Sequence, residues 1–305
     1  MAFGRALTPA SGGLDRDAAT RMDDTALDTA WNEPDARVLW IGSGGRLPFI
    51  QYEDRLALGL VQVRGERSAQ YLYLGRAGGA PLFCSSAEMA AAEGVSCPEP
   101  SGGWQHPFVV SDALSPLEIE IMTVALALTN WHESMPRSAR DGELTTIAQG
   151  GWARVDALGG EHFPRTDPAV IVLIEHKNSI LLGSNLLWET GRFSLLAGFV
   201  EAGESAEEAV IREVQEEAGV PLERVRYVAS QAWPFPRSLM LGFRASLAAG
   251  ADPEALCPDP TEISELRWFS RDELRDPSAD LKLPGKLSIA RTLIDLWVAE
   301  DDSEQ

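Results

Sequence analysis

The chain has 305 residues and a formal net charge of −20, and hydrophobic residues make up 45% of it. This is the composition of a globular protein, and the length favours two domains over one. The negative charge disfavours general binding to nucleic-acid backbones, and no run approaches the ~20 apolar residues of a membrane span. Three widely spaced cysteines and an amino terminus without an apolar leader predict a cytoplasmic protein with no disulfide framework and no membrane partner.

Residues 1–25 are small and polar, and we expect a flexible arm there. Over 26–131, short apolar runs such as RVLWIG and QYLYLG alternate with Gly, Pro and charged residues, which predicts a β-rich N-terminal domain. It ends in a helix over 116–131, because Ser115 and Glu118 have the spacing of a capping box. This domain carries no recognisable chemical motif.

Residues 132–166 form a polar, Gly-rich connector, and residues 167–305 alternate strand-like runs with helices. The strands are expected at AVIVLIEH, SILLG, RFSLLAGFV, ERVRYVASQ, LMLGFRASL and ELRWFS, and the last helix at SIARTLIDLWVAE. This alternation predicts a mixed α/β (α+β) sandwich for the second half of the chain.

One segment of that half, GFVEAGESAEEAVIREVQEEAGV at 198–220, carries seven glutamates and one arginine. Like charges three or four positions apart destabilise a helix, so a bound cation is the simplest compensation. Ser205 and Glu208 predict the start of the helix, and Gly219 its end. We expect Ile211, Val214 and Ala218 to pack on the sheet, and Arg212 to pair with Glu216.

Glu213, Glu216 and Glu217 stand at i, i+3 and i+4 and therefore share one face of the predicted helix. Three hard oxygen donors on one face suit Mg²⁺ or Mn²⁺. The alternative is a solvated face that is rich in glutamate and binds nothing.

The spacing of the fixed positions argues against that alternative. Gly198, Glu204 and the run Arg212-Glu213-Val214-x-Glu216-Glu217-x-Gly219-Val220 resemble the Nudix box of the Nudix hydrolase superfamily. The resemblance implies an α/β/α sandwich and metal-assisted hydrolysis of a nucleoside diphosphate linked to another group. It implies metal ligation by the Ala197 carbonyl and by Glu213, Glu216, Glu217 and Glu262, with Glu217 the first choice of general base and Glu216 the second.

Ten residues beyond the box begins SQAWPFPRS, which resembles the signature loop of the NADH pyrophosphatase (NudC-type) family. Ala232 stands where that family has proline, which loosens the loop and puts substrate preference in doubt. The plainer interpretation is a Pro- and aromatic-rich loop that closes a sheet edge. Stiff apolar side chains in this loop can form a wall for flat rings. The implied substrate positions are Phe163, Phe199, Gln231, Ala232, Trp233, Pro234, Phe235, Pro236, Arg237, Ser238 and Ala290.

The family commonly carries a four-cysteine zinc ribbon between its domains, but the connector at 132–166 contains no cysteine. His132 and His162 alone cannot close a zinc site, so no zinc is predicted. We expect a zinc-ribbon-like connector held by residues such as Trp131, Trp152 and Phe163.

The favoured function is metal-dependent hydrolysis of the pyrophosphate of NADH or NAD⁺ to NMNH or NMN and AMP. The resemblance also implies removal of NAD caps from RNA 5′ ends, with contacts confined to the first nucleotides, and a homodimer. One alternative is an enzyme for ADP-ribose or another dinucleotide. Another is a non-catalytic dinucleotide sensor, against which the complete set of glutamates argues.

Overall fold

The structure is a computed structural model that describes residues 13–52, 55–91, 94, 99–100 and 102–300. Within these residues the chain forms two compact units. The C-terminal unit comprises 167–232 and 238–300, and the N-terminal unit comprises the described residues up to 166 together with Trp233–Arg237. None of the helices within the described ranges has the length and apolarity to cross a bilayer.

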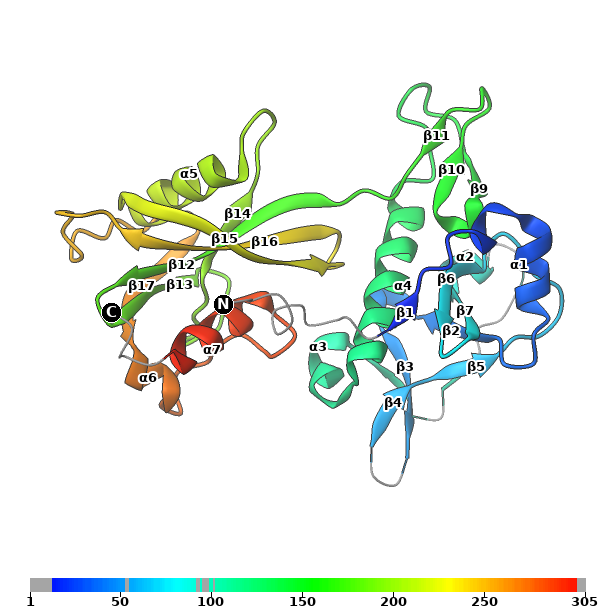
Figure 1. The fold of residues 1–305 in the computed structure, drawn as a ribbon, viewed down its shortest axis with the longest axis horizontal. Helices are drawn as coiled ribbons and strands as arrows, with labels where there is room; N and C mark the ends of the chain where they lie inside the picture. The colour runs from blue at the N-terminus through cyan, green and yellow to red at the C-terminus, as the bar shows by residue number, and fades with distance from the viewer. Residues whose placement is uncertain (1–12, 53–54, 92–93, 95–98, 101, 301–305) are drawn as a thin grey trace. The chain divides into compact units, whose positions relative to one another are not determined.

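A six-stranded mixed sheet forms the centre of the C-terminal unit (Figure 1). Its order is β15-β16-β12-β13-β17, and β14 also pairs with β12. The β12–β16 pair is parallel, whereas β12 pairs antiparallel with both β13 and β14. The elements are β12 (Asp167–His176), β13 (Ser179–Asn185), β14 (Leu196–Phe199), α5 (Ala206–Ala218), β15 (Leu222–Trp233), β16 (Ser238–Leu247), β17 (Ile263–Ser270), α6 (Arg271–Arg275) and α7 (Ile289–Ala299).

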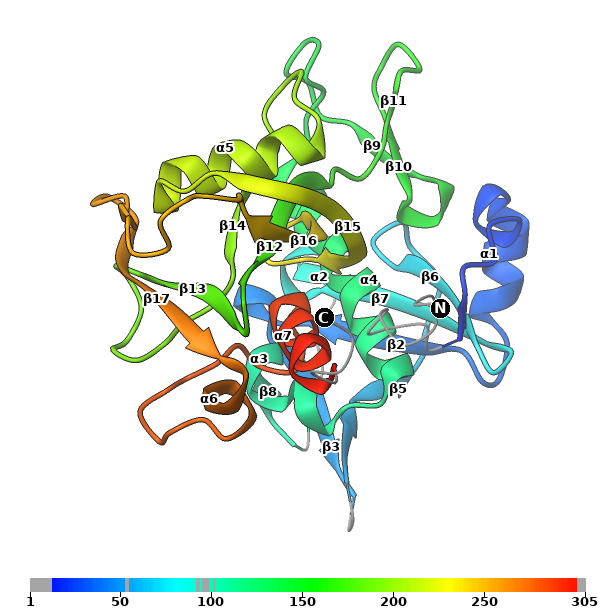
Figure 2. The same ribbon diagram turned by 60° about the vertical axis from the view of Figure 1, so that its left-hand side comes forward.

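Helices α5 and α7 cover opposite faces of this sheet (Figure 1, Figure 2). Alternate side chains of β12 point to opposite faces, as the period of a strand requires. Val170 and Val172 therefore pack with α5, and Ile171 and Leu173 pack with α7. This is the expected α/β/α sandwich, and all six strand-like runs of this half form strands.

The N-terminal unit is β-rich, as expected, and has three small sheets. Their orders are β1-β6-β7-β2-β5, β4-β3-β8 and β11-β10-β9. The strands are β1 (Leu14–Asp15), β2 (Arg37–Ile41), β3 (Leu47–Gln51), β4 (Leu56–Leu58), β5 (Leu60–Gln62), β6 (Leu72–Ala77), β7 (Ala80–Ser86), β8 (Trp104–Gln105), β9 (Thr146–Ala148), β10 (Ala153–Val155) and β11 (Glu161–His162). The helices are α1 (Asp24–Trp31), α2 (Ala87–Ala91), α3 (Pro107–Val110) and α4 (Pro116–Ser134), with 3-10 turns at Thr20–Met22, Ser43–Gly45, Ser111–Ala113 and Gln149–Gly151.

The start of the described chain differs from the expected flexible arm. Residues 1–12 lie outside the described residues, but Leu14 pairs with β6 and the Asp23 carboxylate caps α1. Two apolar residues of α1, Leu27 and Trp31, are buried in the core of this unit. The segment is ordered because its cap and its apolar residues tie it to the sheet.

The connector forms the three-stranded antiparallel sheet β9-β10-β11. Trp131 is buried, and the Trp152 indole N–H donates to the Tyr73 carbonyl at 2.7 Å. Phe163 is 55% exposed, so the expectation that it holds the connector together is wrong. The connector also buries a cluster of three polar groups that are hydrogen-bonded to one another.

Those polar groups are His132, Thr145 and Arg154, and all three are buried. Arg154 donates to His132 Nδ1 at 2.8 Å and to Thr145 Oγ1 at 2.6 Å. Because an arginine can only donate, Nδ1 accepts, and the proton of the imidazole lies on Nε2, which donates to the Gly151 carbonyl at 2.8 Å. Burial, together with the Arg154 charge, lowers the pKa of His132 to about 4, so the ring is neutral at pH 7.

Candidate active site

Helix α5 begins and ends where the sequence predicts. Ser205 and Glu208 form both hydrogen bonds of a capping box, and Gly219 closes the helix with φ +70° in the left-handed region. The predicted apolar face is wrong at one position, because Ile211 is 48% exposed. Ala209 and Val210 are buried there instead, beside Val214 and Ala218 as expected.

Arg212 connects the helix to the loop before it. Its guanidinium makes two hydrogen bonds to the Glu204 carboxylate, at 2.8 and 2.9 Å, and one to the Phe199 carbonyl at 2.8 Å. It also binds Glu213 at 3.0 Å and Glu216 at 3.1 Å, which includes the pair expected from the sequence. One cation thus offsets the repulsion among three glutamates, and the role of Glu204 becomes visible only in the structure.

Gly198 lies directly against the carboxylate of Glu213. A Cβ atom built at position 198 would come within 1.9–2.2 Å of that carboxylate, which is well below any normal contact. A larger residue at this position would displace the Glu213 carboxylate, which binds Arg212, so glycine suits the close approach of that side chain. Burial raises the pKa of Glu213, although its hydrogen bond to Arg212 works in the opposite direction.

Glu217 is the most unusual of the glutamates. It is only 7% exposed, and its Oε2 atom is buried without a hydrogen-bond partner. Burial raises the pKa of Glu217 to about 8, and the charges of Glu213, Glu262 and Asp259 add to this shift. A hydrogen bond with the backbone of Ala197 lowers it in part.

Glu262 comes from a different part of the sheet. It immediately precedes β17 and is exposed, and its carbonyl accepts from the Leu186 amide at 2.9 Å. Asp259, which sequence reasoning did not single out, has its amide 3.3 Å from the Glu217 carbonyl. The only sequence signal for Asp259 is its closeness to Glu262 in the acidic stretch DPTE.

The donor set fits a hard cation. A buried carboxylate oxygen without a partner costs free energy unless a ligand or a proton satisfies it. Glu217 supplies such an atom, and the charges of three neighbouring carboxylates act on it. In the described part of the chain, however, no three His, Cys, Asp or Glu side chains lie close enough to hold a metal as they stand. Arg212 holds two of the carboxylates in this arrangement.

The expected substrate residues are dispersed over both units. In the C-terminal unit Phe199 is 59% exposed, whereas Ala290 lies on the buried face of α7, in the core between that helix and the sheet. The buried Gln231 side chain donates to the Leu287 carbonyl at 2.6 Å and accepts from the Ile289 amide at 2.7 Å. Both the nitrogen and the oxygen of its side-chain amide thus help to fix the start of α7. Ala232 is exposed and Ser238 is buried.

Phe163 and the loop Trp233–Arg237 belong to the N-terminal unit. Phe163 follows β11 with its ring exposed. In the loop, Pro234 is buried, and the rings of Trp233 and Phe235 lie edge to face at 5.0 Å.

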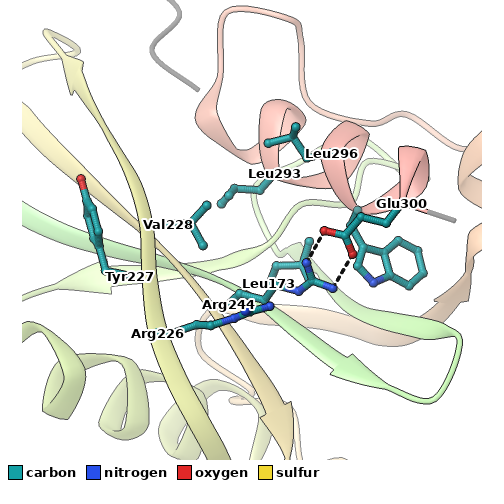
Figure 3. A pocket seen from close by; sticks show the side chains of 9 residues that line it. Leu173, Arg226, Tyr227, Val228, Arg244, Leu293, Leu296 and Glu300 are labelled. Atoms are coloured by element: carbon teal, nitrogen blue, oxygen red, sulfur yellow. Dashed lines mark hydrogen bonds and ion pairs between the residues drawn. The ribbon is translucent and has the colours of Figure 1, made fainter. Parts of the chain in front are cut away.

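A cavity of about 130 Å³ lies in the C-terminal unit between β15, β16 and α7 (Figure 3). Leu173, Val228 and Leu293 line its apolar side, and Arg244 lies between the carboxylates of Glu175 and Glu300. Because Leu173 and Leu293 belong to the core beneath α7, this cavity is on the face of the sheet opposite α5. We therefore do not assign it to the glutamate site.

Comparisons with known proteins agree with this architecture. The family model described as NUDIX domain matches residues 164–291. A NUDIX hydrolase from Nitrosomonas europaea, known from its crystal structure, is 25% identical and covers 48% of this chain and 83% of its own, with a TM-score of 0.40. The residues that the family model matches contain the glutamate box and most of the sandwich, which are the features of the class of Nudix hydrolases.

Relatives of higher sequence identity match most of the chain. A protein of Mycobacterium tuberculosis (strain ATCC 25618 / H37Rv) is 37% identical over 301 residues, which is 94% of this chain and 93% of the relative. Another, of Stutzerimonas stutzeri (strain A1501), is 36% identical over 234 residues, or 74% of this chain and 76% of the relative. Both are named NAD-capped RNA hydrolase NudC. The chain belongs to the NudC-type family of Nudix hydrolases.

Proposed function

We propose that this protein hydrolyses the pyrophosphate of NADH or NAD⁺ to NMNH or NMN and AMP, and that it removes NAD caps from RNA 5′ ends. The names of the relatives that match 94% and 74% of the chain support the choice of substrate. The partnerless buried oxygen of Glu217, within a complete Nudix box, is the observation that carries the choice of chemistry.

We propose Mg²⁺ or Mn²⁺ as the cofactor. The Ala197 carbonyl, Glu213, Glu216, Glu217 and Glu262 would hold it. When bound, such an ion neutralises charge on the pyrophosphate and lowers the pKa of a bound water.

Glu217 is the preferred general base, and Glu216 is the second choice. An oxygen of Glu216 is already bound to Arg212, whereas the Oε2 atom of Glu217 has no partner. In its ionised form the Glu217 carboxylate accepts a proton from the water that attacks phosphorus. A P–O bond then forms to that water, the anhydride bond breaks, and AMP and the mononucleotide separate.

Phe199 and the loop Gln231–Ser238 are proposed to contact the rings of the substrate, with Phe163 and Ala290 as further substrate positions. Two rings of the loop, Trp233 and Phe235, pack edge to face and present apolar ring faces of the kind on which flat ligands stack. The net charge of −20 favours contact with only the first nucleotides of an RNA.

The test is the release of AMP from NADH, NAD⁺, ADP-ribose and NAD-capped RNA, each with Mg²⁺, with Mn²⁺ and with excess EDTA. We expect metal-dependent turnover, with NADH or NAD-capped RNA preferred over ADP-ribose. Binding of NADH without any turnover in the presence of metal would favour the alternative, a dinucleotide sensor. Turnover that persists in EDTA would exclude the proposed chemistry.

The family resemblance also supports a homodimer in the cytoplasm, and we propose both. Light scattering measures the mass directly. A homodimer gives twice the 33.1 kDa of the chain, and a solution containing only the 33.1 kDa species would exclude the dimer.

A further inference from the structure

The loop Trp233–Arg237 connects two strands of the C-terminal unit, yet it is part of the N-terminal unit. Its neighbours are therefore side chains that lie more than a hundred positions earlier in the chain. Two of these, Phe108 of α3 and Asn130 of α4, contact the loop through ring packing and hydrogen bonds, and the His106 ring lies 6.3 Å from the ring of Phe235.

Asn130 holds the backbone of the loop at two places. Its side-chain nitrogen donates to the Pro234 carbonyl at 2.9 Å and to the Pro236 carbonyl at 3.1 Å. Both partners are carbonyl oxygens, so the amide nitrogen must face them rather than the amide oxygen. A primary amide provides two hydrogens on one planar nitrogen, which no carboxylate or hydroxyl of similar size can replace.

Phe108 supports the aromatic rings of the loop. Its ring stacks on Trp233 with centroids 5.5 Å apart and planes 19° apart, and it lies 4.6 Å from the ring of Phe235. Phe108 is nevertheless 52% exposed, so these contacts cover only part of it. The next residue, Val109, is 74% exposed.

We propose that Asn130 and Phe108 are positioning residues that set the shape of Trp233–Arg237 as a surface for a flat ring of the dinucleotide. This inference rests on the proposed function. The sequence provides a reason why the loop needs such support, because Ala232 leaves the backbone freer than proline would. The N-terminal unit thereby acquires a role in substrate recognition through side chains that need not touch the substrate.

The decisive variant is Asn130→Asp, which keeps the size of the side chain and removes both donated hydrogen bonds. We expect the KM for NADH to rise about tenfold while kcat changes less than threefold, because loop shape affects ring binding rather than the attack on phosphorus. Thr123→Ala is the matched control on the same helix, since it removes only a hydrogen bond to the Ile119 carbonyl.

The second series changes the stacking partner. Phe108→Leu removes the ring and is expected to raise the KM for NADH by about three- to tenfold. Phe108→Tyr keeps the ring and should restore the KM of the unaltered protein. Val109→Ala, at an adjacent and more exposed apolar position, is the control and should leave the KM unchanged.

Thermal unfolding is measured on every variant, so that a purely structural role can be recognised. The inference is overturned if Asn130→Asp and Phe108→Leu leave the KM unchanged in a protein that hydrolyses NADH, and the proposed function then still stands. It is also overturned if kcat falls with no change in KM. If Asn130→Asp does not fold, the Phe108 series decides. Failure of the unaltered protein to hydrolyse any dinucleotide would remove the proposed function and this inference together.

Discussion

The two units of this protein both bury polar groups, but they differ in whether those groups have hydrogen-bond partners. In the connector, His132, Thr145 and Arg154 satisfy one another and the Gly151 carbonyl at distances of 2.6–2.8 Å. In the glutamate site, Glu217 is buried with one oxygen that has no partner. A satisfied polar cluster belongs to the structure of a protein, whereas a buried acceptor without a partner indicates a place for a proton or a ligand.

The connector at 132–166 contains none of the four cysteines of a zinc ribbon. The connector forms a three-stranded sheet, and hydrogen bonds from Arg154 join the buried side chains of His132 and Thr145. In the glutamate site, by contrast, the structure gives the Glu217 Oε2 atom no hydrogen-bond partner, and the charges of the neighbouring carboxylates oppose ionisation of Glu217.

The largest expected effect is that of Glu217→Gln. We expect AMP release to fall by about 10²–10³-fold, because under the proposed assignment the variant removes the group that accepts the proton of the attacking water. Glu207→Gln, on an exposed glutamate of the same helix, is the matched control and should retain activity. Near-normal turnover of Glu217→Gln would contradict the assignment of its role.

The stability of the Glu217→Gln variant also tests whether Glu217 is a buried group without a partner. The folded pKa of Glu217 is about 8, above the value of 4.5 for an ordinary glutamate, so the metal-free folded protein binds a proton that the unfolded chain releases. Stability without metal therefore decreases as pH rises from about 4.5 to 8. Glu217→Gln should be more stable than the unaltered protein in EDTA at pH 8, as measured by thermal unfolding.

The next effect in size concerns the connector. Arg154→Met removes the donor to His132 and Thr145 and leaves their acceptors buried, so we expect a loss of about 3 kcal/mol in the free energy of unfolding. Arg137→Met changes an exposed arginine of the same connector and is the control. Urea unfolding in EDTA measures both. Equal stability of the two variants would show that the buried cluster contributes nothing.

The smallest effect is a pH dependence of opposite sign to that of Glu217. The folded pKa of His132 is about 4, below the ordinary value of 6.5, so the unfolded chain binds a proton that the folded protein excludes. The stabilisation is present above pH 6.5 and declines toward pH 4, by about 2 kcal/mol between pH 7 and 5. In urea unfolding at successive pH values, His132→Gln should flatten this part of the profile, and an unchanged slope would assign it to other groups.

Local patterns in the sequence predicted the glutamate helix almost completely. Its start depends on Ser205 and Glu208, and its end on Gly219, all of which act within a few residues of one another. The one error, Ile211 in place of Val210, arose because neighbouring positions on a helix differ by only ~100°, so the edge of a buried stripe is poorly defined. The sheet at the site was also predictable, because its strands are long apolar runs.

Contacts between distant positions were not predictable in this way. Nothing near residue 130 in the sequence indicates that its amide binds the carbonyls of Pro234 and Pro236. The satisfied state of Gln231 likewise depends on the Ile289 amide, 58 positions away. The burial of Glu217 depends on how α5 packs on the sheet, and the spacing of the glutamates does not contain that information.

The five residues Trp233–Arg237 also determine where this chain can be divided. A fragment that begins at residue 167 would contain the six-stranded sheet and all the glutamates of the candidate site, but its aromatic loop would have lost the Asn130 amide and the Phe108 ring that contact it. A fragment that stops at residue 166 would contain Asn130 and Phe108 but not the loop that they contact. Cutting the chain between residues 166 and 167 therefore does not yield two fragments that each keep all of their own contacts.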